Sequence, residues 1–195
     1  MKSKVIAVTG GIGSGKSEVL KYLSSLGYFT VDCDVLAKEV SARAETVEKV
    51  RQLLGDEYVV DGQLNRKAIR NKVFADKQLL HQYNSLFFTE VKNLLDNRIS
   101  QYKSDLKQNT NKSKIIFVEI SVFDAFDYFW DGVWLVEADV NARIDRVIER
   151  DGVSRQNIDD ILHSQNVCTH YTLKIVNDGN LDYLQTQVTA ALKTI

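Results

Sequence analysis

Proline is absent from this chain of 195 residues, although it makes up about 5% of an average protein. Cysteine is nearly absent as well, since the sequence holds only Cys33 and Cys168. Two cysteines this far apart form neither a disulfide framework nor a metal-binding cluster. Cys33 stands between two aspartates, which disfavour its thiolate, so we interpret it as a small buried residue.

The sequence also lacks any apolar run near the roughly 20 residues of a membrane-spanning helix, and any signal-peptide pattern at its start. Its formal net charge is −1, so it lacks the excess of basic residues that is typical of proteins binding nucleic acids or membrane surfaces. We therefore expect a cytoplasmic monomer that acts on small-molecule substrates, with neither nucleic-acid nor membrane partners.

What is present is the composition of an ordinary globular protein, with 44% hydrophobic and 26% charged residues. Short apolar runs predict strands, and apolar residues at helical spacing predict helices between them. The expected strands cover 5–8, 28–31, 115–120, 133–138 and 174–176; the expected helices cover 35–54, 140–150 and 154–166, with one more ending at Gly27 and a last one starting at Leu181. This alternation predicts an α/β fold with a parallel five-stranded sheet and helices on both faces.

Residues 62–107 break the alternation because they are almost purely helical. Asp61-Gly62 predicts a turn before them, and Asn65 and Asp76 are expected to cap two helices. The polar run QNTNKSK at 108–114 predicts a loop after them, and the aromatic run FDAFDYFW at 123–130 predicts core or a pocket wall. We predict that 62–107 is a helical insertion in a core formed by 1–61 and 108–195.

The first expected strand leads directly into T-G-G-I-G-S-G-K-S, in which residues 10–17 match the pattern G-x-x-x-x-G-K-[ST]. In this phosphate loop, glycines let backbone N–H groups turn inward and form a site for anions. Lys16 would reach the β- and γ-phosphates, and the Ser17 hydroxyl would bind Mg²⁺. The alternative is a glycine-rich turn that matches by chance, but the strand before it and the helix after it favour nucleotide binding.

A second polar cluster, Asp32-Cys33-Asp34, follows the second expected strand. Ligands of parallel α/β sheets bind beyond the carboxyl ends of the strands, where the phosphate loop also lies. If this segment is extended, the two aspartates share one face and Cys33 points away. They would then orient or deprotonate an attacking hydroxyl, or help to hold Mg²⁺. The alternative is a solvated turn that caps the next helix.

These stretches resemble the opening of dephospho-coenzyme A kinases. The resemblance continues through DGQLNRKAIRNKVFAD and RIDRVIERDGVSRQNIDDILHSQ, and so covers nearly the whole chain in the family's order. That family transfers the γ-phosphate of ATP to the ribose 3′-hydroxyl of dephospho-CoA, the last step of coenzyme A synthesis. The resemblance implies a sheet of the P-loop kinase type, ATP and Mg²⁺ as cofactors, a CoA-side domain at 62–107 and a helical lid at about 140–166.

The resemblance also implies roles for particular residues. Asp34 would act on the attacking hydroxyl, with Lys16 as the second catalytic residue and Ser17 on Mg²⁺. The expected nucleotide-binding residues are Gly11, Gly13, Ser14, Gly15, Lys16, Ser17, Glu18, Arg146, Asn177 and Gly179, the last two in a turn that meets adenine. The expected substrate-binding residues are Asp32, Asp34, Arg66 and Phe88.

Three arginines, Arg143, Arg146 and Arg150, match the family's lid. Spaced three and four residues apart, they share one helix face, and each guanidinium can donate two hydrogen bonds to phosphate oxygens. The alternative is a solvated helix surface on which they pair with Asp145 and Glu149.

Several positions depart from the family pattern. Glu18 replaces the usual threonine, the segment 86–89 lacks the family's His-Pro, and 119–123 lacks the proline and glutamate of Pro-Leu-Leu-x-Glu. The segment VCTHYTL at 167–173 is about one helical turn short. The absence of proline is partly explained by these departures. Glu119 ends an apolar strand, where it is either a metal-linked acid or a plain strand-end carboxylate.

Three functions fit these residues. The first is a dephospho-CoA kinase, and the second is a related kinase for another hydroxyl-bearing nucleotide or metabolite. The third is a non-catalytic ATP-binding homologue, against which Lys16 and Asp34 argue. A GTPase is disfavoured, because the sequence has no N-K-x-D guanine motif.

Overall fold

The computed structural model describes residues 3–74, 76–108, 113–123, 127–152, 154–165 and 168–195, apart from the side chains of residues 74, 157, 160, 163 and 164. Most of the predicted loop 108–114 and parts of the runs 123–130, 154–166 and 167–173 therefore lie outside the described residues. The chain divides into two compact units, one formed by Met1–Asp32 with Gln101–Ile195 and the other by Cys33–Ser100.

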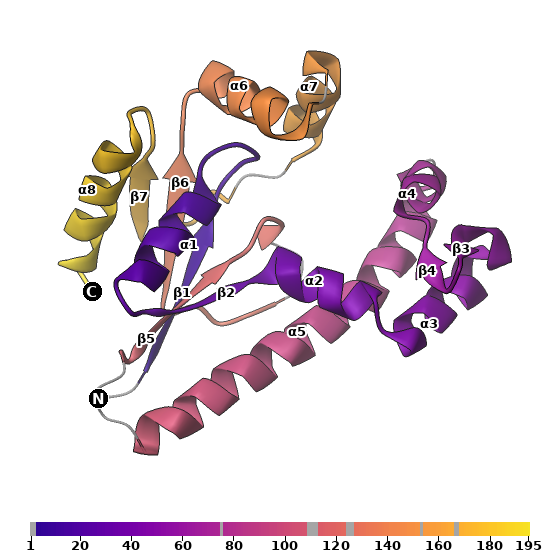
Figure 1. Cartoon of the computed structure of the whole chain (residues 1–195), viewed down its shortest axis with the longest axis horizontal. Coiled ribbons are helices and arrows are strands. Elements are labelled where there is room, and N and C mark those ends of the chain that lie inside the picture. Colours follow the sequence, from indigo (N-terminus) through magenta and orange to yellow (C-terminus); the bar gives the residue numbers. More distant parts are fainter. Residues whose placement is uncertain (1–2, 75, 109–112, 124–126, 153, 166–167) are drawn as a thin grey trace. The chain divides into compact units, whose positions relative to one another are not determined.

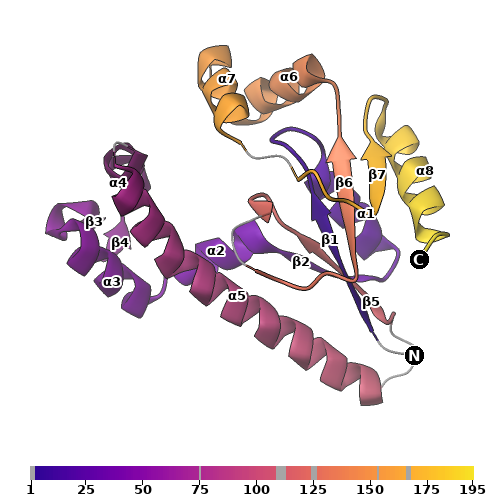
Figure 2. The same ribbon diagram turned by 180° about the vertical axis from the view of Figure 1, so that it is seen from behind.

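Five parallel strands form the sheet of the first unit, in the order β2-β5-β1-β6-β7 (Figures 1 and 2). They are β1 (Lys4–Thr9), β2 (Phe29–Asp32), β5 (Ile115–Glu119), β6 (Gly132–Glu137) and β7 (Leu173–Val176). Each lies within one or two residues of a predicted strand, so the predicted five-stranded parallel sheet is confirmed. Because the strands are parallel, their carboxyl ends meet at one edge, where the phosphate loop follows β1.

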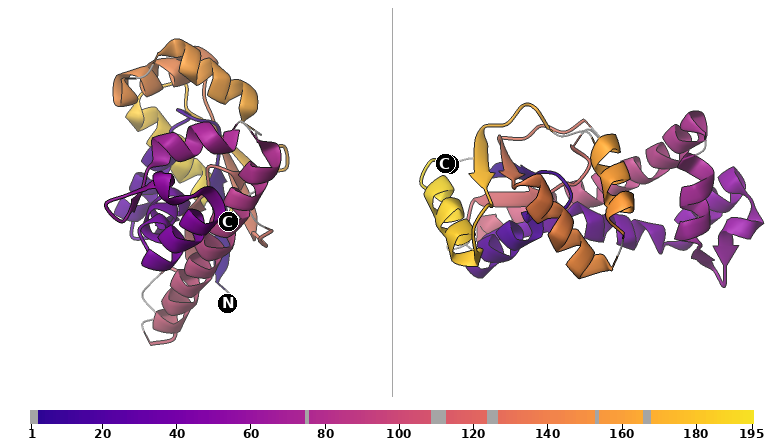
Figure 3. Two further views of the ribbon diagram at one scale, coloured as in Figure 1. Left: turned by 90° about the vertical axis from the view of Figure 1, so that its right-hand side faces the viewer. Right: turned by 90° about the horizontal axis from the view of Figure 1, so that it is seen from above.

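One face of this sheet is covered by α1 (Lys16–Ser25) and α8 (Leu181–Leu192), which pack side by side (Figure 3). Alternate residues of the strands point toward these helices. The buried cluster that they form contains Ile6, Val8, Phe117, Trp134, Val136 and Ile175 from the sheet, and Val19, Leu20, Leu23, Leu184, Val188 and Ala191 from the helices. The other residues of β1, such as Val5 and Ala7, are buried as well, so this central strand is covered on both faces.

Two further helices, α6 (Val140–Asp151) and α7 (Arg155–Ser164), correspond to the predicted lid. Ile144 and Val147 of α6 pack against Ile158 of α7 in a small buried cluster. Ile12 of the phosphate loop packs against the same cluster. The helices α6 and α7 are therefore joined to the phosphate loop by apolar contacts.

The second unit contains α2 (Cys33–Ser41), α3 (Ala44–Leu54), the short 3₁₀ helix η1 (Asp56–Tyr58), a hairpin of β3 (Val59–Val60) and β4 (Gln63–Leu64), α4 (Arg66–Phe74) and most of α5 (Lys77–Gln108). The predicted single helix 35–54 is wrong, because Arg43 has an extended backbone (φ −72°, ψ 136°) that separates α2 from α3. The predicted turn at Asp61-Gly62 is confirmed, and it joins β3 to β4.

Side-chain caps fix the helices of this unit where the sequence predicts them. Asn65 Oδ1 accepts a hydrogen bond from the backbone N–H of Ala68, and Asp76 Oδ1 accepts one from that of Leu79. Val50, Ile69 and Val73 form the buried centre of the unit. No helix within the described parts of the chain combines the length and the apolar character that crossing a membrane requires.

Candidate active site

The phosphate loop has a backbone that requires glycine. Gly13 and Gly15 have positive φ angles of 73° and 98°, in the region that other residues adopt only with strain. At Gly13 a side chain would also collide with the main-chain carbonyl of Arg143 in α6. The glycine pattern is therefore needed by the fold of the loop, which argues against a chance match.

Lys16 brings a positive charge into this loop. Its side chain is only 7% exposed, and Nζ donates hydrogen bonds to the carbonyl oxygens of Gly10 (2.9 Å) and Gly11 (3.2 Å). Both of these acceptors are neutral carbonyl oxygens. The first turn of α1 begins at the same place and adds the positive end of its dipole. Loop, lysine and helix together have the features of a phosphate-binding site.

Ser17 and Glu119 place oxygen atoms beside the loop. Ser17 Oγ donates a hydrogen bond of 3.1 Å to Glu119 Oε1, and Glu119 is 4% exposed. Asp32 is the register partner of Glu119 on the neighbouring strand. The contact with Ser17 favours the interpretation of Glu119 as a metal-linked acid over that of a plain strand-end carboxylate.

These oxygens fit Mg²⁺, which is typically held by one or two carboxylates together with substrate phosphates and water. Within the described ranges, no group of three or more His, Cys, Asp or Glu side chains could hold a metal ion. A hydroxyl and a buried carboxylate suffice to bind an ion whose other ligands are the phosphates of a nucleotide and water. Ser17 would be a ligand of the ion, and Glu119 would orient the Ser17 hydroxyl.

Two of the three predicted lid arginines contact the phosphate loop. Arg143 Nε donates to the Ile12 carbonyl at 2.8 Å, and Arg146 Nη1 donates to the Gly13 carbonyl at 3.2 Å. Burial lowers the pKa of the Arg143 guanidinium, and the nearby Glu137 carboxylate acts in the opposite direction. Arg150 instead pairs with Asp151 at 2.6 Å on the exposed side of α6.

Asn177 and Gly179 follow β7 at the same edge of the sheet. Asn177 Nδ2 donates to the Ser14 carbonyl at 2.8 Å, in a buried bond between segments 163 residues apart. Gly179 is exposed and directly precedes Asn180, which caps α8 by accepting from the Tyr183 N–H. Sequence reasoning missed Gln165, whose side-chain carbonyl accepts from the Ile12 N–H at 2.9 Å.

A cavity of about 410 Å³ opens beside the loop, at the carboxyl ends of β6 and β7. The residues that line it include Gly11, Ser14, Glu137, Arg143 and Asp178. Its volume lies in the range of small-molecule sites. The phosphate loop and this cavity are thus adjacent parts of one candidate nucleotide site.

The remaining predicted residues lie elsewhere. Glu18 is in the first turn of α1 and pairs with Lys21 at 2.6 Å on its surface. Asp34, Arg66 and Phe88 belong to the second unit. Asp34 is exposed in the first turn of α2, so the condition of an extended Asp32–Asp34 segment is not met: β2 ends at Asp32 and α2 begins at Cys33. Arg66 Nη2 donates to Ser41 Oγ at 2.6 Å beside a cavity of about 250 Å³. Phe88 is half-buried on α5.

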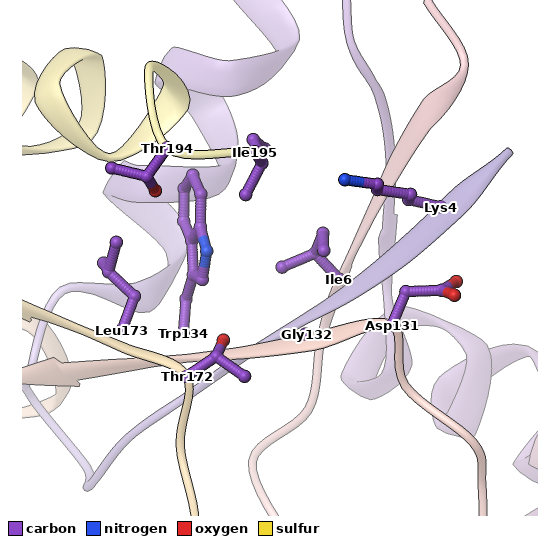
Figure 4. Close-up of a pocket in the computed structure, with 9 residues that line it drawn as sticks. All are labelled: Lys4, Ile6, Asp131, Gly132, Trp134, Thr172, Leu173, Thr194 and Ile195. Atoms are coloured by element: carbon purple, nitrogen blue, oxygen red, sulfur yellow. The ribbon is translucent and has the colours of Figure 1, made fainter. Parts of the chain in front are cut away.

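A second cavity of the first unit, of about 420 Å³, lies at the amino ends of β1, β6 and β7, away from the phosphate loop (Figure 4). Asp131 and Thr172, two of its polar side chains, are already hydrogen-bonded to the backbone of Val5 and Val133. This cavity has neither a glycine-rich loop nor a helix N-terminus. It therefore offers none of the features that bind phosphate in the candidate site.

Comparisons with known proteins agree with this geometry. The family model of dephospho-CoA kinases matches residues 4–180. A dephospho-CoA kinase of Fusobacterium nucleatum is 30% identical, and the match covers the full length of both chains. One of Thermus thermophilus is 35% identical over 79% of this chain and 71% of its own length.

Solved structures share the fold. The crystal structure of a Thermus thermophilus protein superimposes with a TM-score of 0.82 at 29% identity, covering 100% of this chain and 99% of its own. The dephospho-CoA kinase of Campylobacter jejuni gives a TM-score of 0.61 at 18% identity, covering 98% and 96% of the two chains. At that identity the likeness concerns the fold alone, and it confirms the predicted P-loop kinase architecture.

Proposed function

The chain belongs to the dephospho-CoA kinase family, and from this premise we propose that it transfers the γ-phosphate of ATP to the ribose 3′-hydroxyl of dephospho-CoA. This reaction completes coenzyme A. The observation that carries the proposal is the phosphate loop, in which the buried Lys16 donates to the Gly10 carbonyl and Ser17 contacts Glu119. Phosphoryl transfer depends mostly on positioning and on neutralising charge, and these groups supply both.

Each group has a separate task in the proposed reaction. Lys16 and the loop N–H groups would bind the β- and γ-phosphates, and Mg²⁺ when bound would neutralise the charge that develops on them. Ser17 would hold the ion, and Glu119 would fix the Ser17 hydroxyl through its hydrogen bond. Arg143 and Arg146 would bring guanidinium charge to the loop from α6.

The acceptor side of the reaction is assigned to Asp34, Arg66 and Phe88 of the second unit, together with Asp32 at the end of β2 in the first. We propose that Asp34 orients the 3′-hydroxyl and accepts its proton as the hydroxyl oxygen bonds to the γ-phosphorus, while the bond from that phosphorus to the bridging oxygen breaks and ADP leaves. Asp34 is exposed in the first turn of α2. Asp32, Arg66 and Phe88 are proposed to bind dephospho-CoA, with Arg66 beside the cavity of its unit. Cytoplasmic location and a monomeric state stay predictions from the sequence.

The departures at 86–89 and 119–123 make the acceptor the part of the proposal to test first. ADP release from ATP and Mg²⁺ should be followed with and without dephospho-CoA, with adenosine and other nucleosides as control acceptors. We expect strong stimulation by dephospho-CoA alone. Stimulation by another acceptor would instead support a kinase with a changed substrate. ATP binding without stimulation by any acceptor would support a non-catalytic homologue.

A further inference from the structure

The phosphate loop can bind an anion only if its carbonyl oxygens point away from the site. A backbone that turns its N–H groups inward must turn its carbonyls outward, and an oxygen that rotated back would repel phosphate. Glycines allow such rotations more readily than other residues. Something must therefore hold the carbonyls of a loop with glycine at positions 10, 11, 13 and 15.

Each carbonyl from Gly10 to Ser14 accepts a hydrogen bond from a side chain. Those of Gly10 and Gly11 accept from Lys16, within the motif itself. The next three accept from outside the motif. The pairs are Ile12 with Arg143 (2.8 Å), Gly13 with Arg146 (3.2 Å) and Ser14 with Asn177 (2.8 Å).

Asn177 is the best fixed of these outside donors. It is 6% exposed, and its backbone N–H donates to the Glu137 carbonyl at 2.8 Å, at the end of β6. Its own carbonyl accepts from Arg146 at 2.9 Å, and Arg146 also donates to Gly13. The Asn177 amide lies so close to Gly15 that a side chain at Gly15 would collide with it. Asn177 is thus bonded to both the sheet and the lid helix.

We infer that Asn177 is a positioning residue for the phosphate loop, whose amide holds the Ser14 carbonyl outward so that the loop presents its N–H groups to the nucleotide phosphates. This inference rests on the proposed function, which requires that the loop bind those phosphates. It differs from the role in adenine contact that the family resemblance implies for Asn177. A contact with adenine affects the binding only of ligands that carry the base, whereas a role in positioning the loop affects the binding of any ligand that carries the phosphates.

The test compares two ligands that share phosphates but not the base. Isothermal titration calorimetry should measure the binding of tripolyphosphate and of ADP to the wild-type protein and to Asn177→Ala. We expect Kd to rise about three- to tenfold for both ligands, by the same factor, because the variant loses one buried hydrogen bond. Asn177→Asp, which keeps the shape but loses the donor, should give at least the same loss.

Asn180→Ala is the matched control. It is the same substitution three residues away, and it also removes a side-chain hydrogen bond, the one from the Tyr183 N–H. That bond caps α8 and does not touch the phosphate loop. We expect this variant to bind tripolyphosphate as the wild type does. Far-UV circular dichroism should show that all variants are folded.

Four results would overturn the inference. The first is a loss of ADP affinity in Asn177→Ala with tripolyphosphate unchanged, which would assign Asn177 to adenine. The second is unchanged binding of both ligands. The third is an equal loss in Asn180→Ala, which would reveal a merely structural effect. The fourth is a wild-type protein that does not bind tripolyphosphate. If binding behaves as expected but dephospho-CoA accepts no phosphate, the proposed function fails and the positioning role stands.

Discussion

At the scale of single residues, the proposed role of Asp34 as the group that orients and deprotonates the attacking hydroxyl can be tested directly. We predict that Asp34→Asn lowers kcat by about 10²- to 10⁴-fold, the usual contribution of a general base, and leaves ADP affinity nearly unchanged. Steady-state ADP release and calorimetric binding measure the two quantities. Asp56→Asn, at an exposed carboxylate of the same unit, is the control and should keep full activity. Equal activity of Asp34→Asn and wild type would remove Asp34 from the mechanism.

A second prediction at the scale of single residues concerns Glu119. Glu119→Gln keeps the shape of the side chain and can still accept from Ser17, but it removes the negative charge near the expected ion. We predict that the Mg²⁺ concentration needed for half-maximal ADP binding rises about 10- to 100-fold, as for other residues that orient a metal ligand. Binding of ADP in the absence of Mg²⁺ should change little. An unaltered Mg²⁺ titration would contradict a metal-linked role.

At the scale of elements, α6 depends on Asp139, the N-cap residue that directly precedes it. Asp139 Oδ1 accepts from the N–H groups of Asn141 (2.9 Å) and Ala142 (3.1 Å) and so caps the helix. We predict that Asp139→Ala lowers the free energy of unfolding by about 0.5–2 kcal/mol. Urea denaturation followed by tryptophan fluorescence measures this loss. Asp145→Ala, at an exposed position within the same helix, should cost less, and equal losses would argue against the cap.

The helices and strands also show which parts of the fold can be predicted from the sequence and which cannot. The strands, the caps at Asn65 and Asp76 and the phosphate loop have local signatures, and the structure has them where they are expected. The break between α2 and α3 has no such signature, because neither glycine nor proline marks Arg43. The strands β3 and β4 have two residues each, which is too short for an alternating pattern.

The side chains that hydrogen-bond to the backbone of the phosphate loop from outside it were the least predictable part of the site. Arg143, Gln165 and Asn177 meet the loop across 131 to 163 positions of sequence, and only the fold brings them there. The resemblance named Asn177 but implied a contact with adenine. It named Arg150 with the lid, although this arginine pairs with its neighbour Asp151. Residue type and spacing do not show which way a guanidinium or an amide points.

At the scale of the whole molecule, both tryptophans report on one unit. Trp130 and Trp134 belong to the unit that contains the phosphate loop, whereas circular dichroism reports on both units. We predict that Mg²⁺ and ADP raise the thermal midpoint seen by tryptophan fluorescence, since a ligand at one hundred times its Kd stabilises by about 2.7 kcal/mol. Lys16→Ala should reduce the rise. If the thermal midpoint seen by fluorescence does not change with the ligand, the nucleotide does not bind to the unit that contains the phosphate loop.

The position of β1 in the sheet affects how the chain must be made. This strand is synthesised before the other strands of its sheet, and its two neighbours, β5 and β6, are more than 100 residues later in the sequence. At about 5–20 residues per second, the ribosome takes roughly 5–20 s to deliver them. The apolar segment Val5–Val8 waits for that time without its strand partners, while the second unit, a single continuous segment, is completed first. This topology therefore leaves an apolar strand of the nascent chain without its partners, and we expect a chaperone or the ribosome surface to cover it until β5 and β6 are made.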